Sequence, residues 1–324
     1  MSELQSFFEP TEQPQTSTDL SLRLAKAARD GDLDTVRRWL AAGGSPDASK
    51  THAGNTISLL EVACNSSRPS NAEIVGLLCA AGVNVNPGGD GAPICLASKY
   101  GAEAAVRHLL RAGASVHGPE ENVGPLHNAV MGNNWFFYKD PWSIDQAKSA
   151  ASIGHQGIIR MLLAHGAAVD ERASSSQSTP LHIAARLAGF ISLSVVKELL
   201  RRGASLDAVD AHLGLNAEGH ARNRLHDPVY TGDGIPETPQ LKRRPGAVEA
   251  FLALLADVRA AGSFKRYANA PRLDVVVLQA LCAKGRATPP PALARLFPTS
   301  TKSPHLPREI FWRILSYWRT DRDP

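Results

Sequence analysis

The apolar residues of this 324-residue chain recur at helical spacing in short segments, and most of these segments end at a glycine. In the clearest case, residues 195–200 read VVKELL, which places its valines and leucines on one helical face, and Gly203 follows. A glycine at this place can adopt the left-handed conformation that ends a helix. A shorter segment of small and apolar residues precedes it at 181–185. The pattern predicts paired short helices, which cannot bury their apolar faces without stacked neighbours.

The glycines that close these helix pairs divide the chain into units. They are Gly43, Gly82, Gly113, Gly166 and Gly203, spaced 39, 31, 53 and 37 residues apart. A period of about 33 residues with insertions is typical of stacked helical repeats. A sixth, less regular unit runs from residue 214 to Gly262 and is interrupted at 223–246 by a stretch rich in Pro, Gly and Asp. That stretch predicts a long exposed loop.

The motif of the fifth unit is informative about the fold family. Residues 179–185 read TPLHIAA and residues 199–207 read LLRRGASLD, and together they resemble an ankyrin repeat. The resemblance implies an all-α ankyrin-repeat solenoid of five or six helix-turn-helix repeats joined by hairpin loops, over residues 20–262. It also implies a protein-binding surface made of hairpin tips and inner helices. The tip residues that would take part are Asp47, Asn84, His117, Asp170 and Asp207.

Composition agrees with this interpretation. Hydrophobic residues make up 43% of the chain but aromatic residues only 6%, which favours close packing of helices through small side chains. The four cysteines form no CxxC pair, and we expect free thiols in a reducing compartment. No apolar run approaches the about 20 residues of a membrane span. We expect a soluble cytoplasmic protein, with nuclear import through the KRRP sequence at 242–245 as an alternative.

No segment of the sequence predicts catalysis. His127 and His182 lie in PLH motifs, where the ankyrin resemblance implies that the histidine satisfies buried polar groups of neighbouring hairpins. The glycine-rich stretch at 87–91 lacks the GK[ST] ending of a phosphate-binding loop. We therefore expect neither enzymatic activity nor a cofactor or metal ion.

Two segments outside the regular units have distinctive compositions. Residues 1–19 are rich in Gln, Thr, Ser, Pro and Glu and predict a disordered leader. The insertion at 132–152 concentrates aromatic residues, of which Trp135, Tyr138 and Trp142 are the expected anchors for a protein partner. The alternative is that the aromatic rings fold back onto the solenoid, and we expect this for the phenylalanines at 136 and 137.

Residues 263–324 predict a helical C-terminal module. Within it, residues 306–318 read LPREIFWRILSYW, with the apolar residues on one helical face. This segment resembles the first helix of an F-box, and repeats followed by such a segment resemble the architecture of poxviral PRANC proteins. The resemblance implies contact with a Skp-type adaptor of a cullin ubiquitin ligase. The residues expected in that contact are Leu306, Pro307, Ile310, Ile314, Leu315 and Trp318.

Other interpretations of the C-terminal module remain open. The chain has one such helix where an F-box has three, and Trp318 replaces the usual leucine. Residues 272–282 also resemble the leucine-rich first helix of a SOCS box. A third interpretation is a helix that only caps the last repeat. From residue 241 onward the chain has 15 Lys and Arg against 6 Asp and Glu, so nucleic acid is a further, less favoured partner.

Taken together, these features predict a non-enzymatic protein-interaction adaptor. Its sharper form is a substrate receptor that holds a client protein on its repeats and recruits a cullin-type ligase through its C-terminal helix. The alternative is a structural scaffold or localisation protein with no link to ubiquitin.

Overall fold

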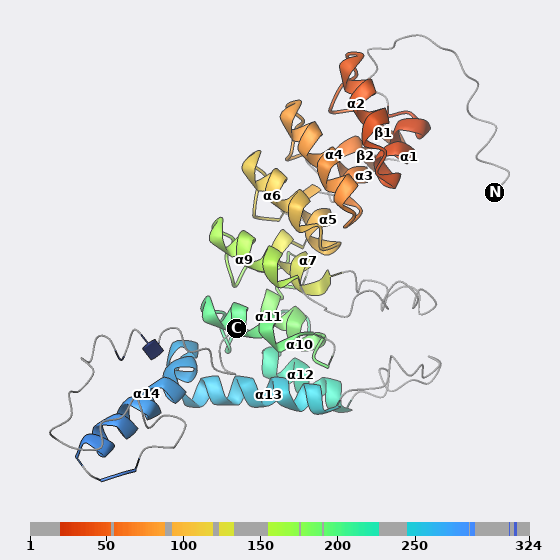
Figure 1. The fold of residues 1–324 in the computed structure, drawn as a ribbon. Coiled ribbons are helices and arrows are strands. Elements are labelled where there is room, and N and C mark those ends of the chain that lie inside the picture. Colours follow the sequence, from red (N-terminus) through yellow and green to blue (C-terminus); the bar gives the residue numbers. More distant parts are fainter. Residues whose placement is uncertain are drawn as a thin grey trace. The chain divides into compact units, whose positions relative to one another are not determined.

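The computed structural model describes residues 20–52, 55–87, 93–118, 123–132, 155–174, 176–189, 191–226, 245–284 and 286–288, together with 311, 314 and 315. Over these residues the chain is almost entirely helical (Figure 1). It divides into two compact units, Met1–Ile183 and Ala184–Pro324.

The first unit is built from helix pairs that follow one another along the chain. The pairs are α1 (Leu22–Asp30) with α2 (Leu33–Ala41), α3 (Leu59–Cys64) with α4 (Pro69–Ala80), α5 (Pro93–Lys99) with α6 (Glu103–Arg111), and α7 (Pro125–Met131) with α9 (Gln156–Ala164). The first helices contact one another in the order α1, α3, α5, α7, and the second helices in the order α2, α4, α6, α9. Figure 1 shows these two rows. The predicted stacking of ankyrin-type helix pairs is therefore confirmed.

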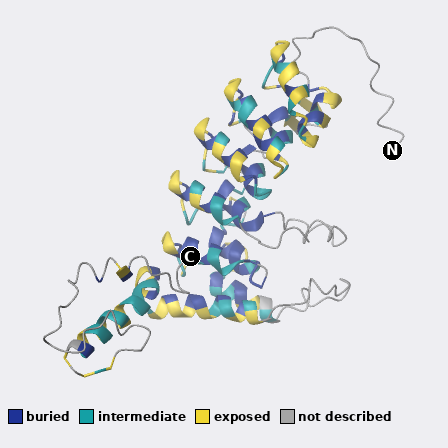
Figure 2. Cartoon of the chain, in the orientation of Figure 1, coloured by how far each residue is buried: buried dark blue, intermediate teal, exposed yellow. Residues whose placement is uncertain are grey.

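Burial follows the two rows. The largest fully buried side chains of this unit are aliphatic, and Figure 2 shows the buried residues on the faces where neighbouring helices meet. Small residues such as Ala28, Ala63, Ala97 and Ala129 are also buried and allow the helices of the first row to pack closely.

A short antiparallel hairpin extends the tip of the first repeat. Strand β1 (Ser49–His52) pairs with β2 (Asn55–Ser58), and the hydroxyl groups of Thr51 and Thr56 lie 2.8 Å apart across the pair. The repeat pattern gave no sign of this hairpin, because its polar residues have no helical period.

The second unit contains α11 (Leu193–Arg201), α12 (Ala217–His226), α13 (Pro245–Ala260) and α14 (Phe264–Ala283), while α10 (Pro180–Arg186) lies at the boundary between the units. Helix α13 packs against α12 and α14, and α14 also contacts α11. After α11 the chain bends at residues 206–207 and forms no strand there.

The boundaries of α14 also differ from expectation. The SOCS-box resemblance covers residues 272–282, whereas α14 begins earlier, at Phe264, and contains Pro271. A proline inside a helix removes one backbone hydrogen bond. The guanidinium group of Arg272 donates to Ala268 O at 3.4 Å and to Asn269 Oδ1 at 3.3 Å, which adds polar contacts in the turn where the regular ladder is interrupted.

A buried polar pair holds the start of the sixth unit. Asp210 Oδ1 accepts hydrogen bonds from the N–H groups of Leu213 and Leu215, and Asp210 Oδ2 lies 2.9 Å from His220 Nε2. Burial by itself raises the pKa of Asp210, but these hydrogen bonds and the nearby imidazole lower it below the ordinary value. The sixth unit has no TPLH motif, and this pair contributes a different polar anchor.

The closing glycines are required for their backbone conformation. Gly82 and Gly113 have φ of +80° and +86°, and a Cβ atom at either position would meet nothing within 4 Å. The predicted left-handed helix end is confirmed, and the constraint comes from the backbone, with no contribution from crowding.

We predict that Gly113→Ala lowers the free energy of unfolding by about 1–2 kcal/mol, because an L-residue pays that cost in the left-handed region. Gly246→Ala is the matched control, since Gly246 lies in the first turn of α13, has no positive φ and also has free space around it. Urea denaturation of the three proteins measures the effect. Equal loss in both variants would show that the left-handed backbone is not the cause.

Candidate protein-interaction surfaces

The hairpin tips of the first unit are shaped by local side-chain turns. After Gly43, Gly82 and Gly113, the side chain of the residue two places later accepts a hydrogen bond from a backbone N–H two residues further on. These bonds join Asp47 N to Ser45 Oγ at 3.2 Å, Asn86 N to Asn84 Oδ1 at 3.0 Å, and His117 N to Ser115 Oγ at 3.2 Å. The Asn84 side chain, which was predicted to contact a partner, therefore already accepts a hydrogen bond within its own tip.

A second set of hydrogen bonds links each tip to the next. Asp47 Oδ1 accepts from Asn84 N at 2.7 Å, and Asn86 Oδ1 accepts from Ser115 N at 2.8 Å. Asn86 Nδ2 also donates to Gly113 O at 3.0 Å. The side chain four residues after Gly43 or Gly82 thus forms a hydrogen bond with the backbone of the following repeat. Asp47 is exposed, as predicted, but its carboxylate helps to hold the repeats in register.

The third tip lacks this arrangement because His117 stands at that position. The contact there runs in the opposite direction, with Glu171 Oε1 accepting from Gly118 N at 3.0 Å and lying 3.9 Å from His117 Nδ1. A Cβ atom on Gly124 would lie 2.7 Å from Glu171 Oε2, so a larger residue there would displace the Glu171 carboxylate. Asp170, beside Glu171, is partly exposed.

His127 contacts the backbone of the next hairpin, as the resemblance implied, whereas His182 bonds to Thr179 of its own motif. His127 Nε2 lies 2.9 Å from Ser178 O, which belongs to the next hairpin. His182 Nδ1 accepts from the hydroxyl of Thr179 at 2.8 Å and from its N–H at 3.0 Å. Both histidines are buried. Their hydrogen bonds give these rings a structural role.

The opposite end of each repeat has its own inter-repeat contact. Asn71 Nδ2 donates to Ala28 O at 2.7 Å, and His155 Nε2 lies 3.1 Å from Lys99 O. Both side chains stand eleven residues before a closing glycine, Gly82 or Gly166, and both reach the carbonyl end of the first helix in the preceding repeat. Sequence reasoning missed these residues, although their shared distance from the glycines was a readable signal.

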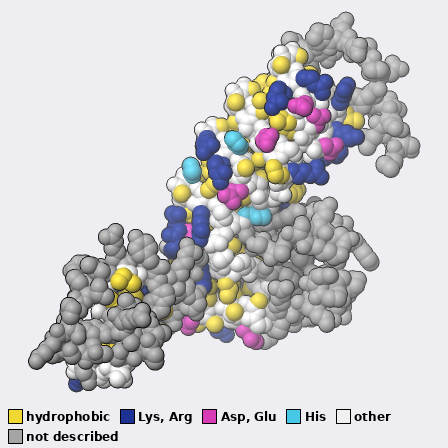
Figure 3. All heavy atoms as spheres, in the orientation of Figure 1, with side chains coloured by type: hydrophobic (Ala, Val, Ile, Leu, Met, Phe, Trp, Pro, Cys, Tyr) yellow, Lys and Arg dark blue, Asp and Glu magenta, His cyan; other side chains and the backbone are white. Residues whose placement is uncertain are grey.

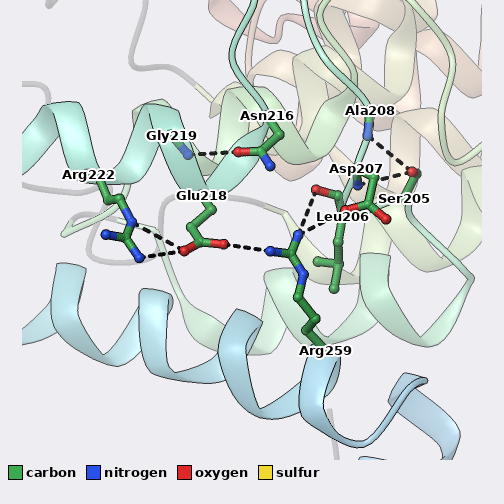
Figure 4. Close-up of polar contacts among 9 residues, drawn as sticks. All are labelled: Ser205, Leu206, Asp207, Ala208, Asn216, Glu218, Gly219, Arg222 and Arg259. Carbon is green, nitrogen blue, oxygen red and sulfur yellow. Dashed lines mark hydrogen bonds and ion pairs between the residues drawn. The ribbon is translucent and has the colours of Figure 1, made fainter.

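The fifth tip is tied to the helices that follow it (Figure 4). Arg259, in the last turn of α13, donates to Asp207 Oδ1 at 3.0 Å and to Leu206 O at 3.4 Å. Its other nitrogen donates to Glu218 Oε2 at 2.9 Å, and Glu218 also pairs with Arg222. Asp207 remains exposed, so the contact contributes less than about 1 kcal/mol but orients the tip.

In the C-terminal module, part of the predicted adaptor helix packs inward. Phe311 and Leu315 are buried with Cys282 in one cluster, against Val275, Val276, Leu278 and Ala287. Arg272 Nε donates to Leu315 O at 3.2 Å and fixes this contact. Ile314, between the two buried residues, is 39% exposed.

One face of α14 carries exposed apolar residues. Leu273 and Val277 lie four residues apart and are 47% and 57% exposed, and the next turn of that face presents exposed Ala280. Val275, Val276, Leu278 and Cys282 belong to the packed side of the helix. Among the described residues, helix α14 thus has both packed and exposed apolar side chains.

Several predicted contacts lie outside the described residues. They are Trp135, Tyr138 and Trp142 of the insertion, and Leu306, Pro307, Ile310 and Trp318 of the adaptor helix. Their assignment as contacts stays a prediction.

The described part of the chain offers no metal centre, since no three His, Cys, Asp or Glu residues gather there. Burial raises the pKa of the Cys95 thiol to about 12 and that of Cys64 well above its ordinary value, so neither is a ready nucleophile. Among the described helices, none combines the length and apolar character needed to cross a membrane.

We predict that Asn86→Ala lowers the free energy of unfolding by about 1–2 kcal/mol, because two hydrogen bonds between repeats are lost. Asn65→Ala is the control, since Asn65 is also exposed but its side chain makes no hydrogen bond within the described residues. Chemical denaturation compares the two variants. Losses of the same size would remove the register role of Asn86.

We also predict a pH dependence that comes from His155. Burial lowers the pKa of His155 below 6.5, although its bond to Lys99 O opposes the shift. The unfolded chain therefore binds a proton first, and the stabilising contribution is complete above pH 6.5 and declines as the pH falls through the lowered pKa.

His155→Asn tests this pH dependence, because Asn71 makes the equivalent hydrogen bond to a backbone carbonyl in another repeat. Thermal unfolding from pH 7.5 down to about 5 should show a smaller loss of stability in the variant than in the wild type. Parallel curves would mean that other groups cause the dependence.

Comparison with known proteins agrees with this geometry. Residues 176–211 match the model of the ankyrin repeat family. The human protein named "Ankyrin repeat and SOCS box protein 18" is 32% identical over 109 residues, which is 29% of this chain and 23% of that protein. The match therefore spans less than a quarter of the relative. Together with the stacked helix pairs of the first unit, these findings identify an ankyrin repeat at 176–211 within an ankyrin-type fold.

Proposed function

We propose that this chain is a non-enzymatic protein-interaction adaptor that acts as the substrate receptor of a cullin-type ubiquitin ligase. The repeats hold a client protein, and the C-terminal module recruits the adaptor of the ligase. Ankyrin-type repeats bind proteins through tips and inner helices, which supports the first half of this proposal.

The observation that carries the second half is the open apolar face of α14. Leu273 and Val277 lie on the side opposite the packed cluster, so no residue of that cluster covers them. The other face of this helix is already packed. Its exposed aliphatic residues are therefore suited to contact with another protein. The similarity to a human ankyrin repeat and SOCS box protein supports the same assignment.

The buried positions refine which residues of the predicted adaptor helix are available. Leu315 closes the module together with Phe311, whereas Ile314 is exposed. We therefore propose Leu273, Val277 and Ile314 as the adaptor contacts of the described part. Leu306, Pro307, Ile310 and Trp318 stay predicted contacts.

For the client, we propose the hairpin tips and the aromatic insertion. The hydrogen bonds of Asp47 and Asn84 leave their outer atoms exposed while the tip backbone is held in place. A braced tip loses little conformational entropy on binding, which favours recognition of a client. Trp135, Tyr138 and Trp142 stay predicted client contacts.

The alternative is a scaffold whose C-terminal module has no partner. The packing of Phe311 and Leu315 against α14 favours the scaffold alternative, because these two side chains are buried within the chain without any ligase adaptor. The exposed residues on the other face of α14 separate the two proposals.

The test is recovery of purified Skp-type and SOCS-box-type ligase adaptors on the immobilised full chain. Leu273→Gln/Val277→Gln should weaken recovery of one adaptor at least about tenfold, since it removes two central apolar anchors. Leu213→Gln is the matched control, because Leu213 is a leucine of similar exposure in the second unit and lies outside α14. Glutamine preserves helix propensity at the two positions in α14.

The outcomes are distinct. Recovery by the wild type and control, with loss in the double variant, supports the receptor proposal. If neither adaptor binds the wild type, the scaffold alternative stands. Deleting residues 304–324 is a poorer test, because it also uncovers the cluster around Cys282.

A further inference from the structure

The first repeat presents an open surface of mixed apolar and basic character. On α1, Leu22 is 52% exposed, and the exposed residues Lys26 and Arg29 follow it four and seven residues later on the same helical face. Leu24, Ala27 and Ala28 on the opposite face are buried. Figure 3 shows Lys and Arg side chains over this end of the first unit with Asp and Glu side chains among them, and Arg29 Nε lies 3.4 Å from Asp30 Oδ1.

The neighbouring hairpin continues this character. Ile57 is 53% exposed and stands opposite Lys50 in the strand register, so both side chains lie on one face of the hairpin. Leu22, Lys26, Arg29, Lys50 and Ile57 are called the first-repeat surface below.

One hydrogen bond fixes where the preceding chain reaches this surface. Leu20 N donates to Ser49 O at 3.0 Å, and Leu20 is buried. Residue 20 is therefore anchored at β1, next to the Lys50–Ile57 pair and two residues before Leu22. Any segment that precedes Leu20 starts from this point.

The composition of that segment complements the first-repeat surface. Residues 1–19 contain Glu3, Glu9, Glu12 and Asp19 and no Lys or Arg. They also contain an adjacent pair of aromatic residues, Phe7 and Phe8. The acidic groups are attracted to the positive charges of Lys26 and Arg29, and the two aromatic rings can pack against the exposed side chains of Leu22 and Ile57.

We propose that residues 1–19 dock in cis on the first-repeat surface and occupy it until an acidic, aromatic-bearing client segment displaces them. The twelve residues from Phe8 to Leu20 can span about 40 Å, whereas α1 is about 14 Å long, so the tether reaches every part of the surface. A short tether gives an effective concentration of about a millimolar, so a weak contact suffices. This cis occupant is independent of the ligase proposal.

The first test uses cleavage by a glutamate-specific protease after Glu9 and Glu12 in the full chain. Leu22→Gln/Lys26→Gln/Ile57→Thr should speed this cleavage about three- to tenfold, because the docked segment is released. Leu213→Gln is the control, since Leu213 is 54% exposed and lies in the second unit. Salt should speed cleavage of the wild type and of the Leu213→Gln control, and have little effect on the triple variant.

A second test changes the leader and leaves the repeat intact. Phe7→Ser/Phe8→Ser should raise hydrogen exchange at the backbone amides of α1 and the β1–β2 hairpin, and Gln13→Ala/Gln15→Ala should not. Unchanged exchange and equal cleavage rates would overturn the proposal. Cleavage of the wild type that speeds up on dilution would also overturn it, because it would assign the contact to a second copy.

Discussion

Packing between neighbouring helix pairs is the constraint on which the first unit depends. Each pair has an apolar side toward the preceding pair and another toward the following one, so its core is completed only by neighbours. The contacts that run α1, α3, α5, α7 and α2, α4, α6, α9 bury aliphatic and alanine side chains on both sides of each pair. Apolar packing is non-directional, however, and does not by itself choose the register.

Directional polar contacts at the two ends of the repeats supply that register. Asp47 and Asn86 bond backbone N–H groups at the tips, while Asn71 and His155 bond backbone carbonyl groups at the other end. All four side chains bond to backbone atoms, so the side chains of the residues that they contact can differ from repeat to repeat. This arrangement explains how repeats with different sequences can stack with similar geometry.

Departures from the TPLH motif illustrate the same freedom. Before α3, Ser58 and Glu61 form a capping box in which Glu61 N donates to Ser58 Oγ and Ser58 N donates to Glu61 Oε2. Before α7, Gly124 replaces threonine, and the Glu171 carboxylate lies beside it. Residues 176–211 match the family model, and the helix pairs of residues 22–164, with their varied motifs, have the same architecture.

Much of the fold was predictable because its strongest signals are local. A closing glycine needs a positive φ and an amphipathic segment needs a neighbour, and both appear in the sequence at fixed spacing. The β1–β2 hairpin, the start of α14 and the tip-to-tip bonds were not predictable. They depend on which residues meet from different repeats, as when Asp47 meets the backbone of Asn84.

The two faces of α14 show why the candidate site was only partly predictable. The spacing of Phe311, Ile314 and Leu315 predicts one apolar face, but a sequence alone does not say whether that face packs within the chain or remains open. Phe311 and Leu315 pack against the Val275 and Cys282 side of α14, and Leu273 and Val277 remain on the other side. A helix that served only as a cap would need one apolar face, and the exposed Leu273 and Val277 lie beyond that face. This second set of apolar side chains is therefore where we place the proposed partner, because the packed set is already used within the chain.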